Sequence, residues 1–207
     1  MLRPLPELAL LTSLLLAPAF SQPFHRESGS IPVLVASDTL PIPFAGGINT
    51  PNHQFADIDG DGDADLFIFD GDQHLDFYRN VGTRASARFA LQEIAFPSFA
   101  LWFLLADLDG GGALDLLTDD STGIGVRFYV NAGSPSAPSF LLRSATMTDT
   151  AGNAIQGAPI GVPALVDLNG DGTLDLLSSN IVNGSPNLYR NVGTRTDPRF
   201  AFVTGHL

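Results

Sequence analysis

The sequence Asp-Ile-Asp-Gly-Asp-Gly-Asp-Ala-Asp occupies residues 57–65, and the apolar run Leu-Phe-Ile-Phe follows it. Two later segments align with it: Asp-Leu-Asp-Gly-Gly-Gly-Ala-Leu-Asp at 107–115, and Asp-Leu-Asn-Gly-Asp-Gly-Thr-Leu-Asp at 167–175. We call these segments loop one, loop two and loop three. All three have aspartate at positions 1 and 9 and glycine at positions 4 and 6. This shared pattern indicates an internal repeat.

Two further landmarks follow each loop at nearly constant distances. A tyrosine stands 21, 22 and 22 residues after the first aspartate of loops one, two and three, and a phenylalanine stands 11 residues after each tyrosine. A chance similarity of turns rich in aspartate and glycine would not keep these landmarks in register. The landmarks are Tyr78, Tyr129, Tyr189, Phe89, Phe140 and Phe200.

Each repeat unit is predicted to form four short strands. One apolar run enters the loop, a second leaves it, and the tyrosine segment forms a third strand that ends in an Asn-x-Gly turn. Residues around 89–94 and their counterparts form the fourth strand. Four short strands in about 40–50 residues are typical of a propeller blade. We therefore predict an all-β, β-propeller-like chain with about three to four four-stranded blades, which is a partial propeller.

The N-terminus has the features of an export signal. A positive residue, Arg3, precedes the apolar run 8–16, and small residues follow up to Ser21. This pattern predicts a secreted, periplasmic or cell-surface protein, with no membrane span in the mature chain. The predicted organisation is a signal peptide at 1–21, N-terminal strands or a linker at 22–50, repeat 1 at 51–98, repeat 2 at 99–160 and repeat 3 at 161–207. Repeat 2 includes a degenerate loop and an insertion, around 146–163, that is expected to be an extended surface loop.

The composition excludes several classes of function. The 207 residues carry 22 acidic and 10 basic side chains, for a net charge of −12, which opposes binding to nucleic acid. The chain has no cysteine, which excludes disulfides, a cysteine-ligated zinc site and a thiol nucleophile. Hydrophobic residues make up 44% of the chain, enough to build a core.

The three loops are predicted to bind calcium. A hard cation with six to eight oxygen ligands needs several carboxylates that converge from a tight turn, and glycine lets the chain wrap around the ion. The predicted ligands of loop one are Asp57, Asp59, Asp61, Asp63 through its backbone carbonyl, and Asp65. Those of loop three are Asp167, Asn169, Asp171, Thr173 at position 7, and Asp175.

Loop two is a weaker candidate, because Gly111 occupies position 5. Its remaining ligands are Asp107, Asp109 and Asp115. The alternative, a metal-free glycine-rich turn, stays open for this loop. We thus expect two calcium sites and a third, weakened one. An EF-hand is excluded, because it needs a glutamate at position 12 and flanking helices.

The loop pattern, together with the Tyr-x-Asn-x-Gly segment and the closing phenylalanine, resembles the FG-GAP/VCBS repeat family. That family includes the calcium-binding blades of integrin α-subunits and many secreted bacterial proteins. The resemblance covers about residues 52–202 and implies a β-propeller whose calcium ions are structural. It also implies a function in adhesion, or in recognition of an extracellular protein or glycan.

The resemblance favours a non-catalytic binding protein, because no nucleophile elbow, catalytic triad spacing or phosphate loop is visible. The alternative is an extracellular carbohydrate-active enzyme or lectin built on a propeller. His25, His53, His74 and His206 are the residues that could take part in catalysis, whereas Trp102 and the three repeat tyrosines are interpreted as core residues. Three blades can belong to a truncated product, stack openly, or form a homo-oligomer that completes the ring.

Overall fold

The computed structural model describes residues 33–35, 38–40, 51–70, 74–134, 137–157, 162–180 and 185–204. The chain divides into two units, Met1–Ala45 and Gly46–Leu207. In the first unit, β1 (Val33–Val35) and β2 (Asp38–Leu40) form a two-stranded antiparallel sheet. The predicted signal peptide, 1–21, lies outside the described residues, as do His25, His206 and most of the segment in which strands of a fourth blade are expected.

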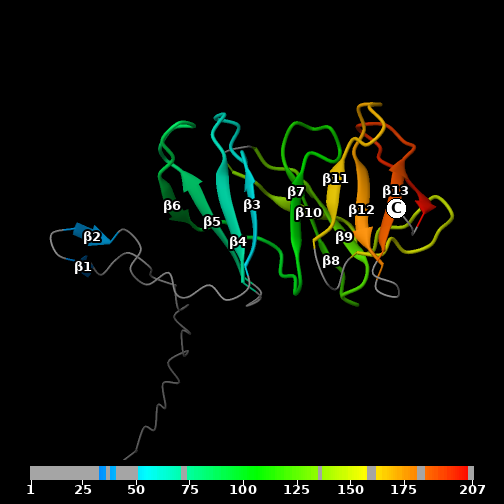
Figure 1. Ribbon diagram of the computed structural model, residues 1–207, viewed down its shortest axis with the longest axis horizontal. Helices are drawn as coiled ribbons and strands as arrows, with labels where there is room; N and C mark the ends of the chain where they lie inside the picture. Colours follow the sequence, from blue (N-terminus) through cyan, green and yellow to red (C-terminus); the bar gives the residue numbers. More distant parts are fainter. Residues whose placement is uncertain are drawn as a thin grey trace, which may run out of the picture. The chain divides into compact units, whose positions relative to one another are not determined.

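The second unit contains three four-stranded antiparallel sheets, shown side by side in Figure 1. We call them blades one, two and three. Blade one consists of β3 (Asn52–Ala56), β4 (Asp65–Phe69), β5 (Leu75–Asn80) and β6 (Phe89–Gln92). Blade two consists of β7 (Phe103–Ala106), β8 (Asp115–Asp119), β9 (Val126–Asn131) and β10 (Phe140–Ser144). Blade three consists of β11 (Ala164–Val166), β12 (Asp175–Ser179), β13 (Pro186–Asn191) and β14 (Phe200–Thr204).

In each blade the strands follow one another in sequence order, and each pairs with its neighbours. The described residues contain no helix, and therefore none that is long and apolar enough to cross a membrane. The predicted all-β, partial-propeller architecture is thereby confirmed. Each aspartate loop joins the first strand of its blade to the second, as the sequence predicted.

The Asn-x-Gly motif forms the turn between the third and fourth strands of each blade. In blade one, the side-chain oxygen of Asn80 accepts hydrogen bonds from the amides of Gly82 and Arg88, both at 3.0 Å. The glycine is required because a Cβ at Gly82 would lie 2.3 Å from the carbonyl oxygen of Ser86. Asn131 and Asn191 make the same pairs of contacts in blades two and three. The predicted turn is confirmed.

The blades pack on each other through opposite faces. We call the face that carries the repeat tyrosine the leading face, and the other the trailing face. The trailing face of blade one (Phe67, Phe69, Leu75 and Phe77) packs against the leading face of blade two (Phe103, Leu105, Leu116 and Tyr129) in one apolar cluster. Leu104, Leu117, Val126 and Phe128 on the trailing face of blade two pack in the same way against Leu165, Leu176, Tyr189 and Phe200. Tyr129 and Tyr189 are therefore core residues between blades, and Tyr78 is also buried, at 6% exposed, as the sequence indicated.

The insertion of repeat 2 corrects one expectation, because its described part is not an extended surface loop. Met147 and Ile155 are 8% and 0% exposed and join the cluster between blades two and three. The Met147 amide donates to the carbonyl of Val126, and Ile155 donates to the carbonyl of Met147. Gly157 lies so close to the buried Trp102 that a Cβ would come within 2.9 Å of its ring. The insertion thus fills the space between two blades.

Candidate metal centres

The three aspartate loops lie at the same end of the sheets, at the top of Figure 1. The first aspartate organises each loop by accepting hydrogen bonds from glycine amides. Asp57 accepts from Gly60 at 2.7 Å and from Gly62 at 2.9 Å. Asp167 makes the equivalent pair in loop three, whereas Asp107 in loop two accepts from Gly112 at 3.1 Å. The glycines at positions 4 and 6 of every loop have positive φ angles between 69° and 90°, which side chains with a Cβ rarely adopt.

Two of the loops gather three carboxylates each. Oxygen atoms of Asp57, Asp59 and Asp61 lie within 4.8 Å of one another, and so do those of Asp107, Asp109 and Asp115. Such clusters can hold a metal ion, because oxygen donors at this separation can reach a common cation. The clustering differs from the ranking that the sequence suggested, since the degenerate loop two has a cluster. Among the described residues, no equivalent group of three occurs in loop three.

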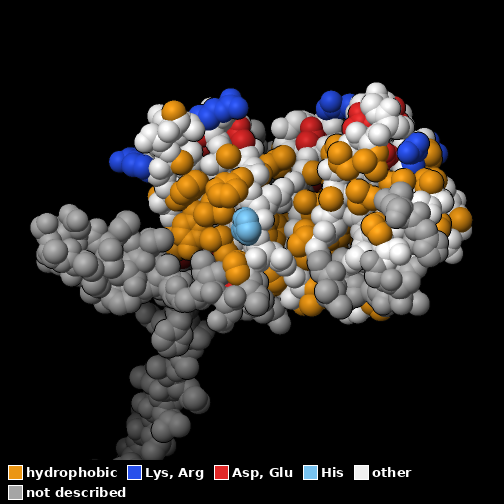
Figure 2. All heavy atoms as spheres, in the orientation of Figure 1, with side chains coloured by type: hydrophobic (Ala, Val, Ile, Leu, Met, Phe, Trp, Pro, Cys, Tyr) orange, Lys and Arg blue, Asp and Glu red, His pale blue; other side chains and the backbone are white. Residues whose placement is uncertain are grey.

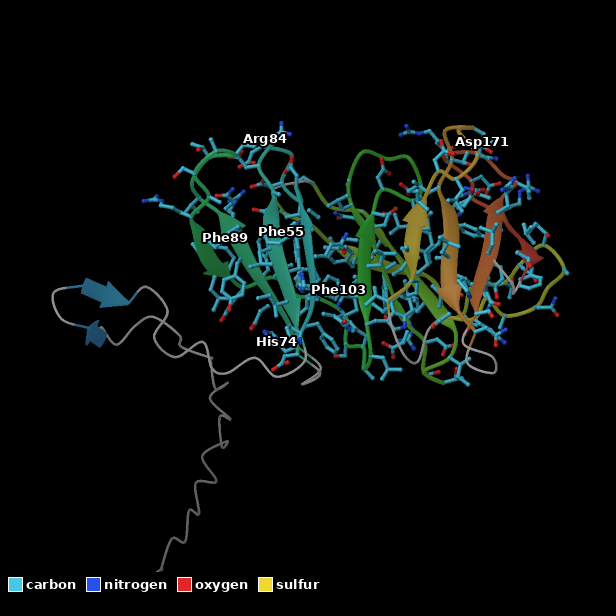
Figure 3. All side chains as sticks on the ribbon, viewed as in Figure 1. Phe55, His74, Arg84, Phe89, Phe103 and Asp171 are labelled. Atoms are coloured by element: carbon cyan, nitrogen blue, oxygen red, sulfur yellow. The ribbon has the colours of Figure 1, made fainter. Side chains whose placement is uncertain are left out.

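Loop three replaces one carboxylate by an amide, and its side chains bond to one another. Asp171 accepts hydrogen bonds from the Thr173 hydroxyl at 2.6 Å and from the Asn169 amide at 2.7 Å. These hydrogen bonds lower the pKa of the Asp171 carboxyl, with the largest contribution from Thr173. Asp171 is therefore ionised and available as an oxygen donor at neutral pH. Figure 3 labels it at the loop end of blade three.

The aspartate at position 9 has a structural role that the sequence analysis missed. Asp65 and Asp115 are each 1% exposed. Asp65 accepts from the amides of Ile58 at 3.3 Å and Asn80 at 2.8 Å. Asp115 accepts from Leu108, Asp109 and Asn131 at 2.9–3.1 Å. These bonds fasten the loop to the third strand of its own blade.

Burial raises the pKa of Asp65 and Asp115, while the hydrogen bonds from backbone amides oppose that rise. Asp175 occupies the same position in loop three, is 0% exposed and accepts from the amides of Leu168 and Asn191. The position 9 residue of every loop was predicted as a metal ligand. The structure places it beneath the loop as a fastening residue. In Asp65 each carboxylate oxygen accepts one hydrogen bond and retains a lone pair for a cation, whereas the Oδ2 atom of Asp115 accepts two.

Arginines lie against two of the loops within the same blade. The Nε atom of Arg79 donates to Asp59 at 2.6 Å, and its terminal nitrogen contacts the same carboxylate. The hydrogen bond to Asp59 raises the pKa of Arg79. Arg190 occupies the equivalent position in blade three, 3.9 Å from Asp175, whereas blade two has Val130 there. These contacts identify Arg79 as a cation already present at loop one.

Loop two receives its arginine from the next blade. A terminal nitrogen of Arg195, in the turn before β14, lies 3.8 Å from Asp107. The backbone of this turn is also close, because a Cβ at Gly110 would lie 3.0 Å from the Arg195 carbonyl oxygen. A cavity of about 270 Å³ lies here and is lined by residues of loop two, loop three and the Arg195 turn. The contact between neighbouring repeats could not be read from the repeat pattern.

The remaining candidates for chemistry do not gather at the loops. His53 is exposed on β3, where its ring contacts that of Phe55. His74 lies 3.5 Å from Asp76, and Figure 3 shows it at the end of blade one opposite to Arg84, away from the aspartate loops. Trp102 is 1% exposed, and the repeat tyrosines are 4–9% exposed. These four rings therefore pack in the core, where they offer no face to a ligand.

Comparisons with known proteins give one match. Residues 57–118, from the first aspartate of loop one through most of β8, match the family model of the FG-GAP-like repeat. No curated protein and no solved structure matches the chain. The matched segment contains loop one, loop two and the strands between them. Residues 57–118 thus carry an FG-GAP-like repeat, the family that the sequence resembles.

Proposed function

We propose that this chain is a calcium-stabilised, non-catalytic repeat protein that acts in extracellular or cell-surface binding or adhesion. The FG-GAP-like match and the three four-stranded sheets support a propeller-type repeat protein. The convergence of carboxylates in loops one and two supports a metal site. FG-GAP repeats are typically extracellular, and the apolar N-terminal run supports export.

The donor set favours calcium over softer metals. Every side chain in the two clusters offers carboxylate oxygen, and calcium takes six to eight oxygen ligands in a flexible geometry. Asp59 and Asp61 each accept one amide hydrogen bond within the loop, which leaves lone pairs free on these carboxylates. In loop two, the Oδ1 atom of Asp107 is buried and has no hydrogen-bond partner. A cation would satisfy this oxygen.

A bound calcium ion would act on stability rather than on chemistry. It would offset the repulsion between carboxylates that lie within 4.8 Å of one another. It would also tie the first two strands of a blade together at the loop end. Because an ion that binds only the folded state stabilises it by mass action, the melting temperature should rise with calcium concentration.

Calorimetric titration and thermal melting test this proposal directly. Wild-type chain stripped with a chelator should bind calcium, and its melting temperature should rise on addition of the ion. Asp61→Ala should weaken the binding, whereas the matched control Asp63→Ala should retain it, because residue 63 is predicted to contribute only its backbone carbonyl. A melting temperature that is the same in calcium and in excess chelator would contradict the structural role of the metal.

A glycan array and a panel of extracellular proteins, each probed with and without calcium, test the binding function. Capture of a defined glycan or protein would identify the class of partner. Turnover of a glycoside by the purified chain in a hydrolase panel would instead favour the alternative, a carbohydrate-active enzyme, and would contradict the non-catalytic assignment.

A further inference from the structure

Among residues 51–204 that the structure describes, the two outer faces of the stack of blades have no further blade packed against them. Within the chain, the trailing face of one blade packs against the leading face of the next. The leading face of blade one and the trailing face of blade three take part in neither of these interfaces. Comparison of equivalent positions in the three blades shows what each outer face lacks.

On the leading face, the first two strands of each blade place apolar residues at equivalent positions. Phe55 of blade one is 58% exposed, whereas its equivalent in blade two, Leu105, is 3% exposed. Leu66 of blade one is half-buried, while its equivalents Leu116 and Leu176 are both 0% exposed. Blade one thus carries the same kind of apolar face as its neighbours, but Phe55 and part of Leu66 meet solvent, whereas Tyr78 on this face is 6% exposed.

Figure 2 shows hydrophobic side chains gathered over blade one. Phe55 and Phe89, labelled in Figure 3, form part of this face, and their ring centroids lie 6.2 Å apart. A contiguous apolar patch of this kind on a protein surface marks an interaction site more often than isolated exposed residues do.

On the trailing face, position 2 of each loop shows the same contrast. Ile58 and Leu108 are each 3% exposed, because the next blade covers them, but Leu168 in blade three is 47% exposed. On the second strand, Phe67 and Leu117 are 0% exposed, whereas Leu177 of blade three is half-buried. The trailing face of blade three therefore exposes Leu168 and part of Leu177, whose equivalents are buried at both internal interfaces, whereas Leu188 on this face is 5% exposed.

We propose that a second copy of this chain covers these faces by head-to-tail packing. The trailing face of blade three in one copy packs against the leading face of blade one in the other. Continuity with the two internal interfaces supports this arrangement, since both outer faces carry the residue types that already fit each other inside the chain. The proposal does not rest on calcium binding or on an external ligand.

A head-to-tail contact either closes into a ring or continues into a filament. Two copies of the three blades that the structure describes would place six blades in a ring, which lies within the range of roughly four to eight blades seen in closed propellers. A ring of two chains would bury both pairs of faces. We therefore infer a closed dimer with two equivalent junctions between the copies.

Light scattering on the full chain, separated by size in calcium-containing buffer, tests this inference. The wild-type chain should have twice the mass of one copy, with no larger species. Phe55→Arg and Leu168→Arg should each give a single copy, because each places a charge in both junctions. Leu141→Arg is the matched control, since Leu141 is 59% exposed on the outermost strand of the middle blade and should leave the dimer intact.

Mixing the two disrupted variants gives the decisive measurement. Phe55→Arg retains an intact trailing face on blade three, and Leu168→Arg retains an intact leading face on blade one. A mixture should therefore restore one junction and yield a species of two copies, although each variant alone does not. A contact between two identical faces would not behave in this way, because only one of the two substitutions would disrupt it.

Three results would overturn the proposal. A wild-type chain of single-copy mass would mean that something other than a second copy covers the faces. Filaments or open-ended oligomers would exclude closure by two chains. A mixture of the two variants that stays at single-copy mass would exclude the head-to-tail arrangement, provided that both variants show the melting temperature of Leu141→Arg and hence are folded.

Discussion

Loops one and two have the same backbone conformation but differ in the charged residues near the position that a cation would occupy. In both, glycines at positions 4 and 6 have positive φ angles, and a buried aspartate at position 9 fastens the loop to the third strand. They differ at position 5, which is Asp61 in one and Gly111 in the other. They also differ in their arginine, which is Arg79 of the same blade for loop one and Arg195 of the next blade for loop two.

Two sets of residues in the loop therefore have separate functions. Glycines and the position 9 aspartate determine the loop conformation, and they are retained in loop two. The residue at position 5 and the nearby arginine set the charge that a cation would meet, and these differ between the two loops. A loop can therefore keep its fold while its affinity for metal changes. Four predictions test this separation.

The largest effect is expected from the fastening aspartates. Asp115→Ala should lower the free energy of unfolding by about 3 kcal/mol, because it leaves buried backbone amides without an acceptor. Asp65→Ala should have a smaller effect, since Asp65 accepts from two amides and Asp115 from three. Urea unfolding in excess chelator measures the free energy of unfolding of each variant without a contribution from metal. If Asp63→Ala on the loop surface were equally destabilising, the fastening role would be wrong.

The next effect concerns position 5 and should appear in calcium affinity. Asp61→Ala should weaken binding at loop one by about tenfold, or about 1.4 kcal/mol, through the loss of a charged ligand. Gly111→Asp should strengthen binding at loop two by a smaller factor. Gly111 does not have a positive φ angle, and a Cβ there would approach only the movable carboxylate of Asp109, at 2.9 Å.

Calorimetric titration of the two single variants and of the wild-type chain measures both changes. Equal calcium affinities for the wild type and Asp61→Ala would refute the ligand assignment at loop one. A Gly111→Asp variant that binds no more calcium than the wild type would show that loop two is a metal-free turn.

A smaller effect is expected from exchanging the residues next to the loops. Arg79→Val should strengthen calcium binding at loop one about two- to threefold, because the guanidinium competes with calcium for Asp59. Val130→Arg should weaken binding at loop two by a similar factor. The Arg79 side chain is 40% exposed, so both effects should shrink as the salt concentration rises. An increase that is independent of salt would point to a cause other than charge.

The last prediction, in which no change of calcium affinity is expected, tests whether the insertion beside loop two matters for its metal site. The hydroxyl of Thr146 donates to Asp120 at 2.8 Å, at the start of the insertion. Thr146→Ala should cost about 1 kcal/mol of unfolding free energy at neutral pH. It should leave the calcium affinity of loop two unchanged. A loss of calcium affinity would mean that the insertion supports the loop.

The destabilisation by Thr146→Ala should depend on pH in a defined direction. Burial alone would raise the pKa of Asp120, but hydrogen bonds from Thr122, Thr146 and Gly125 lower it below the ordinary value. The ionised carboxylate thus stabilises the folded state above the pKa of the unfolded chain. This stability is lost as the pH falls through the lowered pKa. The difference between wild type and Thr146→Ala should therefore be largest near neutral pH and decrease in acid.

The sequence was sufficient to predict what happens inside one blade. Short apolar runs set the strands, and the Asn-x-Gly and aspartate-glycine segments set the turns between them. The strands β3–β6 and the core position of Tyr78 follow from these local rules. The candidate metal ligands of loop one were predicted in the same way.

The features that the sequence did not predict are contacts between blades and the burial of the aspartates beneath the loops. The burial of Met147 and Ile155 depends on how the insertion folds back over blade two. The ion pair between Arg195 and Asp107 depends on how two neighbouring blades are placed. The position 9 aspartates were taken only as ligands, since a residue in a loop pattern rich in carboxylates gives no sign of its depth. These features are set by three-dimensional packing, which leaves no periodic signal in the chain.

The strand order within each blade has a consequence for folding. Every hydrogen-bonded strand pair joins segments that are consecutive along the chain, so a blade can form without waiting for distant segments to meet. Hydrogen bonds also link blades one and two. The side-chain amide of Gln54 donates to the carbonyl of Leu105 and accepts from its backbone amide. Such a chain should assemble as an array of locally nucleated units, with cooperativity carried by nearest-neighbour interfaces. Duplication or loss of a whole blade would then leave the folding route of the remaining blades intact.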